Sequence, residues 1–133
     1  MALDPFQSAE AELRDLIGRG LLEKNLVKQF YVSLSEIVKK ILEAGYSIQT
    51  IEKTTAEILE ELQPRIAEEG NLAELGKFKL LLSGSDLVKF ARHIPSRADH
   101  ELFIQSAFEC LESCRSRKRR IEQASLAQAG EEK

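Results

Sequence analysis

Large apolar residues recur every three or four positions between residues 27 and 42, and polar or charged residues fill the gaps. The apolar set is Val27, Phe30, Tyr31, Leu34, Ile37, Val38, Ile41 and Leu42. This spacing places them on one face of a long amphipathic helix. Burying one such side chain contributes about 1.5–3 kcal/mol before the entropy cost is subtracted, so other elements are predicted to pack on that face.

Capping residues and glycine mark the ends of further helices. Asp4 followed by Pro5 is typical of a helix start, with Asp as the N-cap and Pro in the first turn. Gly45 is predicted to end the long helix, because glycine adopts the left-handed conformation at low cost. Thr54 and Glu57 have the spacing of a capping box and predict the start of the next helix.

The second half of the chain predicts three more helical pieces. Pro64 is expected to stop the preceding helix or to start the next piece. A helix is predicted along Leu72, Leu75, Phe78, Leu81 and Leu82, and Ser83-Gly84-Ser85 is expected to break it. A short helix would follow, with Leu87, Val88, Phe90, Ala91 and Ile94 on its apolar face. Ser96 and Asp99 are predicted to cap the last helix.

These elements predict an all-α fold. We expect a single compact bundle of about five to six helices at residues 4–114, including a helix-turn-helix-like pair. Apolar residues become sparse after Cys114. Residues 115–133 are therefore predicted to form a frayed, flexible basic tail.

Composition agrees with a globular domain. The chain has 133 residues, 43% hydrophobic and 31% charged, and a net charge of −3. No apolar run is long enough to cross a bilayer. Cys110 and Cys114 are one helical turn apart, a spacing that suits neighbouring thiols on a helix face better than a disulfide framework and favours a reducing compartment.

No group of residues predicts a reaction. Cys110 and Cys114 could ligate a metal together with His93 or His100, but their spacing is not that of a zinc motif, and the apolar face of the helix already explains both cysteines. The two histidines have no nucleophile or carboxylate motif around them. We therefore expect no catalytic residue, no metal and no cofactor.

A basic run comes after the last apolar residues of the bundle. Its members are Arg115, Arg117, Lys118, Arg119 and Arg120. They could contact phosphate or an anionic membrane surface, or they could simply solubilise the end of a helix. A DNA-reading helix is not expected at residues 55–63, because this helix carries Glu57, Glu60 and Glu61 and no Lys or Arg.

Four segments of the chain resemble the cytoplasmic domain of BatD-like bacterial membrane proteins, from Bat aerotolerance clusters that also encode MoxR-type ATPases and von Willebrand A proteins. The segments are AELRDLIGRGLLE (11–23), VKQFYVSLSEIVKKIL (27–42), TTAEILEEL (54–62) and SDLVKFARHIPS (85–96). In that family a transmembrane helix precedes this domain. None is present here, which leaves an excised domain or a soluble relative as alternatives. The family supplies no catalytic residue.

The resemblance implies a non-enzymatic interaction domain at the cytoplasmic face of a bacterial inner membrane, or in the cytoplasm if no anchor exists. Its partner would be a MoxR-type ATPase or a von Willebrand A protein. We predict that Lys89, Arg92 and His93 point outward and form the contact surface. The alternative for this segment is a core helix with a polar back. The alternative function is nucleic-acid association through Arg115–Arg120.

Overall fold

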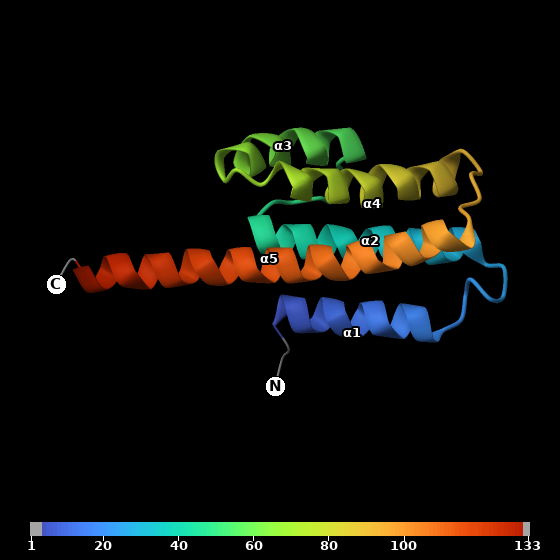
Figure 1. Cartoon of the computed structure of the whole chain (residues 1–133), viewed down its shortest axis with the longest axis horizontal. Coiled ribbons are helices and arrows are strands. Elements are labelled where there is room, and N and C mark those ends of the chain that lie inside the picture. The colour runs from blue at the N-terminus through green and yellow to red at the C-terminus, as the bar shows by residue number, and fades with distance from the viewer. Residues whose placement is uncertain (1–3, 132–133) are drawn as a thin grey trace.

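The computed structural model describes residues 4–131, and within them it contains five helices and no strand. They are α1 (Pro5–Gly18), α2 (Val27–Tyr46), α3 (Thr55–Glu68), α4 (Leu72–Phe90) and α5 (Arg97–Glu131), as Figure 1 shows. The predicted all-α bundle is therefore confirmed.

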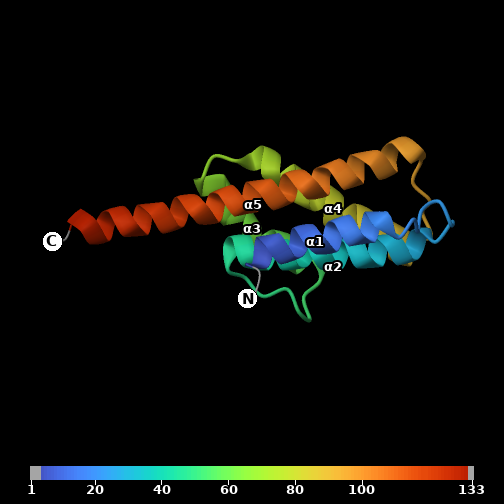
Figure 2. The same ribbon diagram turned by 90° about the horizontal axis from the view of Figure 1, so that it is seen from below.

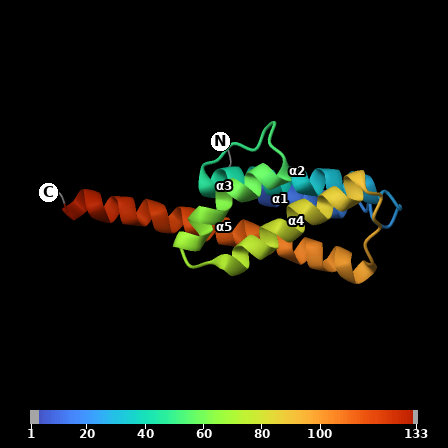
Figure 3. The same ribbon diagram turned by 90° about the horizontal axis from the view of Figure 1, so that it is seen from above.

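Helix α2 lies at the centre of the bundle. It packs against α1, α4 and α5, whereas α3 packs on α4 (Figures 2 and 3). The predicted apolar face of α2 is buried from Phe30 to Leu42, and Val27 at the helix start is half-buried. Burying that face therefore holds three neighbouring helices together.

Three of the predicted caps form. The Asp4 carboxylate accepts hydrogen bonds from the backbone N–H groups of Phe6 and Gln7 at 2.8 and 2.9 Å. Thr54 Oγ1 accepts from the N–H of Glu57 at 3.2 Å, and Ser96 Oγ accepts from the N–H of Asp99 at 3.1 Å. Each cap satisfies an N–H group that has no partner inside its own helix, and so fixes where the helix begins.

Gly45, Pro64 and the Ser83-Gly84-Ser85 stretch do not end helices. Helix α2 passes through Gly45 to Tyr46, and Ser47 takes the left-handed conformation at its end, with φ of 55°. Pro64 lies inside α3, which continues to Glu68, and α4 runs unbroken from Leu72 to Phe90. Ser85 can be buried inside this helix because its hydroxyl is satisfied by donating to the carbonyl of Leu81 at 2.5 Å. Gly84 is used for close packing, since a Cβ there would overlap the ring of Phe103 in α5.

An unbroken α4 keeps one helical phase, and this phase decides which side chains face inward. Phe78, Leu82 and Ser85 succeed one another at helical spacing and are buried. Continuing by four residues brings Lys89 to the same face, while Leu87 and Phe90 turn away from it. The predicted core face of a separate short helix is therefore wrong, and of its five members only Val88 is buried.

Helix α5 extends beyond the rest of the bundle (Figure 1). It passes through the predicted boundary after Cys114 and stays helical to Glu131, because residues 115–118 still pack partly against their neighbours. Residues 119–130 are exposed. The flexibility expected for this tail stays a prediction, and its last two residues, 132 and 133, lie outside the described residues.

No helix between residues 4 and 131 combines the length and the apolar character needed to cross a membrane.

The closest approach of α2 and α5 gives a test of this packing. A Cβ added to Gly45 would lie 2.5 Å from the Cβ of Cys114 and 3.2 Å from its Cα. We expect Gly45→Ala to lower the free energy of unfolding by about 1–3 kcal/mol, because the two helices must separate. Chemical denaturation followed by circular dichroism measures this change.

Gly76→Ala is the matched control, because Gly76 lies inside α4 with open space around it. It should raise the free energy of unfolding by about 0.5–1 kcal/mol through helix propensity alone. Equal effects of the two substitutions would contradict the close α2–α5 contact.

Candidate functional site

The end of α4 and the loop to α5 carry the residues predicted to form a contact surface. This region lies at the same end of the bundle as the connection between α1 and α2 (Figure 1). Arg92 and His93 are exposed there, as expected. The backbone that carries them is held in place because the N–H groups of Ala91 and His93 both donate to the carbonyl of Leu87, at 3.0 and 3.1 Å. Arg92 takes the left-handed conformation between them, with φ of 56°.

Lys89 does not point outward. Its side chain is only 14% exposed, and its Nζ donates to Ser35 Oγ at 3.2 Å and lies 3.7 Å from Asp86 Oδ1. The ammonium group also lies 5.2 Å from the centre of the Phe90 ring. The physical reason is the phase of α4, which places position 89 above Ser85 on the inner face. Lys89 therefore ties α4 to α2 and leaves Arg92 and His93 as the outward polar groups.

Three large apolar side chains face water in this region, and we call them the apolar end. Leu87 is 52% exposed, Phe90 is 77% exposed and Ile94 is 76% exposed. The sequence pattern had predicted all three to lie in the core. If the helical spacing of the buried residues Phe78, Leu81 and Leu82 is continued past Ser83 and Ser85, Leu87 and Phe90 fall on the outer face of the helix.

Arg117, in the middle of the basic run, is used inside the bundle. Its Nε donates to the Glu69 carboxylate at 2.9 and 3.1 Å, and a terminal nitrogen donates to the carbonyl of Gly45 at 2.7 Å. Its guanidinium carbon lies 4.1 Å from the centre of the Tyr46 ring. Arg117 thus joins α5 to the C-terminal ends of α2 and α3, and its charge is matched there.

The other basic residues of the run divide into two groups. Arg115 Nη2 lies 3.9 Å from Glu10 Oε1, and Arg115 Nη1 lies 3.6 Å from Glu112 Oε2. Lys118 Nζ donates to Ser47 Oγ at 3.3 Å. Arg119 and Arg120 are therefore the fully exposed members of the run, whereas Arg115 and Lys118 are partly buried.

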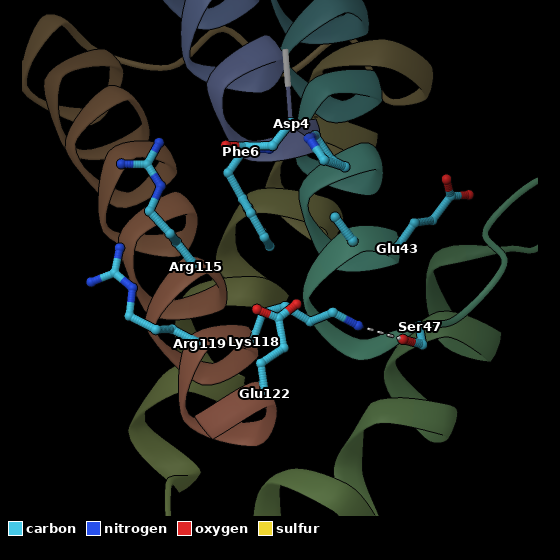
Figure 4. A pocket seen from close by; sticks show the side chains of 10 residues that line it. Asp4, Phe6, Glu43, Ser47, Arg115, Lys118, Arg119 and Glu122 are labelled. Carbon is cyan, nitrogen blue, oxygen red and sulfur yellow. Dashed lines mark hydrogen bonds between the residues drawn. The ribbon is translucent and has the colours of Figure 1, made fainter. Parts of the chain in front are cut away.

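Part of the run borders a hollow of about 510 Å³ between the start of α1, the end of α2 and α5 (Figure 4). Arg115 and Arg119 project from the same side of α5, and Lys118 reaches across to Ser47 (Figure 4). The basic side chains of the lining are balanced in number by acidic ones, which are Asp4, Glu43 and Glu122. The hollow therefore does not concentrate positive charge.

The two cysteines are core residues, as the helical pattern predicted. Cys110 and Cys114 are both free and fully buried. A hydrogen bond with Cys114, together with burial, raises the pKa of the Cys110 thiol well above its ordinary value. A thiol in that state is a poor nucleophile and a poor metal ligand. Among residues 4–131, no group of three or more His, Cys, Asp or Glu side chains is placed to hold a metal ion.

His100 joins two helices. Its Nδ1 lies 2.7 Å from the hydroxyl oxygen of Tyr31, which is fully buried in α2. Burial lowers the pKa of His100, and the nearby Asp99 carboxylate opposes this shift. The neutral ring is therefore favoured, and it fixes the start of α5 against α2, whereas His93 lies in the exposed loop.

Substituting Arg117 and Arg120 separately tests whether the basic run has one residue that stabilises the bundle and another that is merely exposed. Arg117→Met should lower the free energy of unfolding by about 1–3 kcal/mol, because it removes a carbonyl contact and leaves Glu69 without its partner. Arg120→Met makes the same chemical change at an exposed site and should leave the denaturation midpoint unchanged. Equal midpoints for the two variants would contradict an inward role for Arg117.

Comparisons with known proteins identify no relative of this chain. No protein-family model, curated protein or solved structure matches the chain. Its function must therefore be inferred from its own side chains and from the resemblance in its sequence.

Proposed function

We propose that this chain is a non-enzymatic, all-helical interaction domain that docks a partner protein through its apolar end. The observation that carries this proposal is the exposure of Leu87, Phe90 and Ile94 within one short segment. A single exposed apolar residue is ordinary, but a cluster of large ones is typical of a contact surface. A partner that buried all three would gain about 1.5–3 kcal/mol for each side chain.

The backbone around the apolar end favours this role. The carbonyl of Leu87 is satisfied by two N–H groups of the loop, and Arg92 is held in the left-handed conformation. This is a common geometry for a helix C-terminus, in which a left-handed residue lets N–H groups after the helix satisfy its last carbonyls. The surface is therefore ordered before a partner arrives, which lowers the entropy cost of binding.

The resemblance of the sequence to BatD-like domains suggests the partner. We infer a MoxR-type ATPase or a von Willebrand A protein, met at the cytoplasmic face of a bacterial inner membrane. The alternative, nucleic-acid association through Arg115–Arg120, has less support because Arg115, Arg117 and Lys118 contact other parts of the bundle. Two exposed arginines neutralise few phosphates and would give weak binding with a shallow dependence on salt.

The test uses a purified bacterial MoxR-type ATPase and a purified bacterial von Willebrand A protein of the kind encoded in Bat clusters. We expect at least one of them to bind the chain. The double variant Phe90→Ser plus Ile94→Ser should weaken binding about a hundredfold, because central apolar residues dominate such interfaces. Isothermal titration calorimetry measures both affinities.

Leu126→Ser is the matched control, because Leu126 is 73% exposed but lies on the projecting part of α5. It should bind as tightly as the unmodified chain. All variants should unfold at the same midpoint, because every substituted side chain is exposed. Undiminished binding by the double variant would exclude the apolar end as the contact surface, and no binding by either protein would exclude this pair of partners.

A further inference from the structure

Helix α4 carries apolar and small side chains along the side that faces water. They recur every three or four residues over the whole helix and so lie on one face, which we call the outer face of α4. Its members are Leu72, Gly76, Leu80, Ser83, Leu87 and Phe90. Leu72 is 61% exposed, Leu87 and Phe90 are exposed as described above, and Leu80 is half-buried. A largely apolar face about 27 Å long is therefore left uncovered by the other helices.

The charged residues of α4 lie beside or behind this face, where the bundle uses most of them. Lys77 Nζ lies 3.0 Å from Glu109 Oε2 in α5, and Asp86 accepts a hydrogen bond from the Thr55 hydroxyl in α3 at 2.6 Å. Helices α3 and α5 lie on opposite sides of α4 (Figure 1). Lys79, at the edge of the outer face, is the exposed charged residue of the helix. A helix with apolar residues toward water and charges toward its neighbours has the composition of one that is covered on every side.

The outer face of α4 is complementary in shape to a second copy of itself. Two copies can pack antiparallel about a two-fold axis that passes between positions 81 and 82. The residue pairs that then meet across the axis are Leu72 with Phe90, Gly76 with Leu87, and Ser83 with Leu80. Each small residue thus receives a leucine of the other copy, and large side chains close both ends of the contact. Such alternation lets two helices approach closely and makes the same patch serve on both copies.

We propose that a second copy of this chain covers the outer face of α4 in an antiparallel, two-fold symmetric pair. Leu87 and Phe90 belong both to this face and to the apolar end, so the second copy and a docked partner exclude each other. The pair itself does not rest on the proposed function, whereas this competition does. Self-association keeps the apolar end covered until a partner takes the place of the second copy.

The size of the outer face makes this pair weak and reversible. Leu72, Leu87 and Phe90 each expose roughly 100–150 Å². With the smaller residues between them, two copies bury on the order of 1,000 Å² in total, the lower limit for a specific contact between proteins. The two copies of Lys79 lie at one edge of the contact, where water and salt screen their repulsion. We expect a dissociation constant of about 10–100 μM, so the chain is a monomer at about 1 μM, where its unfolding and labelling are measured.

Cysteine pairing tests the direction of the two helices. Leu72→Cys and Phe90→Cys are purified separately and treated with a mild oxidant, alone and mixed, above the dissociation constant. The mixture should form disulfide-linked dimers at least tenfold faster than either variant alone, because antiparallel pairing holds like positions about 27 Å apart. Cys110 and Cys114 are fully buried and should not contribute. Faster linkage of either variant alone, or no linkage in the mixture, would overturn the antiparallel pair.

Gly76→Leu separates shape complementarity from general apolar attraction. A leucine would close the notch that receives Leu87 of the second copy, so the dissociation constant should rise at least tenfold although the variant is more apolar. The monomer should keep its fold, because a Cβ at position 76 meets nothing within 4 Å. Gly130→Leu is the matched control on the projecting part of α5, where a Cβ also meets nothing within 4 Å, and it should associate like the unmodified chain.

Sedimentation equilibrium from about 1 to about 500 μM measures the association of each variant. A chain that stays monomeric over this range would overturn the inference, as would tighter association of Gly76→Leu. Binding of a monomeric chain to phosphatidylglycerol vesicles that is lost in a Leu72→Ser plus Phe90→Ser variant would assign the face to a membrane and overturn it as well.

These measurements are separable from those of the proposed function. Ile94 belongs to the apolar end but not to the outer face of α4, so Ile94→Ser should weaken partner binding and leave self-association unchanged. Gly76→Leu should weaken self-association and leave partner binding intact. A monomeric chain that still binds its partner through Phe90 would exclude the pair and keep the docking surface, and a pair that forms as described while no partner binds would do the reverse.

Discussion

A helix that continues without a break must keep its period, and this constraint determines how α4 meets its neighbours. Because the helix passes through Ser83, Gly84 and Ser85, one phase governs every side chain from Leu72 to Phe90. Ser85 becomes buried and bonds back to the Leu81 carbonyl, and Lys89 reaches Ser35 in α2. Leu87 and Phe90 are left in water. The exposure of the side chains that we propose as a contact surface is thus set by packing on the other face of the same helix.

The rest of the bundle does not need that surface for its stability. The apolar face of α2 is buried by α1, α4 and α5, and Gly45 allows the close approach to Cys114. Arg117 closes the other end of the bundle by joining α5 to Gly45 and Glu69. The end that holds α2, α3 and α5 together is therefore distinct from the end that we propose to bind a partner.

The sequence predicts the helices well because strong periodicity and local caps define them. The face of α2 and the boxes at Thr54 and Ser96 depend on neighbours within a few residues. The end of α4 could not be predicted in the same way. Serine and glycine usually weaken a helix, and only the tertiary structure shows that Gly84 packs against the Phe103 ring and that the buried Ser85 hydroxyl is satisfied by the Leu81 carbonyl.

The basic run of α5 was equally hard to interpret from the sequence. Five basic residues in a row of six suggest an anionic ligand when read along the chain. In three dimensions a helix distributes them around its circumference, and Arg117 meets Tyr46, Glu69 and the end of α2. Local charge predicts a ligand poorly when the counter-charges come from distant parts of the sequence.

The phase of α4 can be measured through the reactivity of cysteines placed on its two faces. Cys110 and Cys114 are fully buried and serve as slow internal references. We expect the thiol of the Phe90→Cys variant to react with a thiol reagent at nearly the rate of an unfolded chain. The thiol of Ser85→Cys should react as slowly as the native cysteines. Fast labelling at position 85 with protection at position 90 would contradict a single phase through α4.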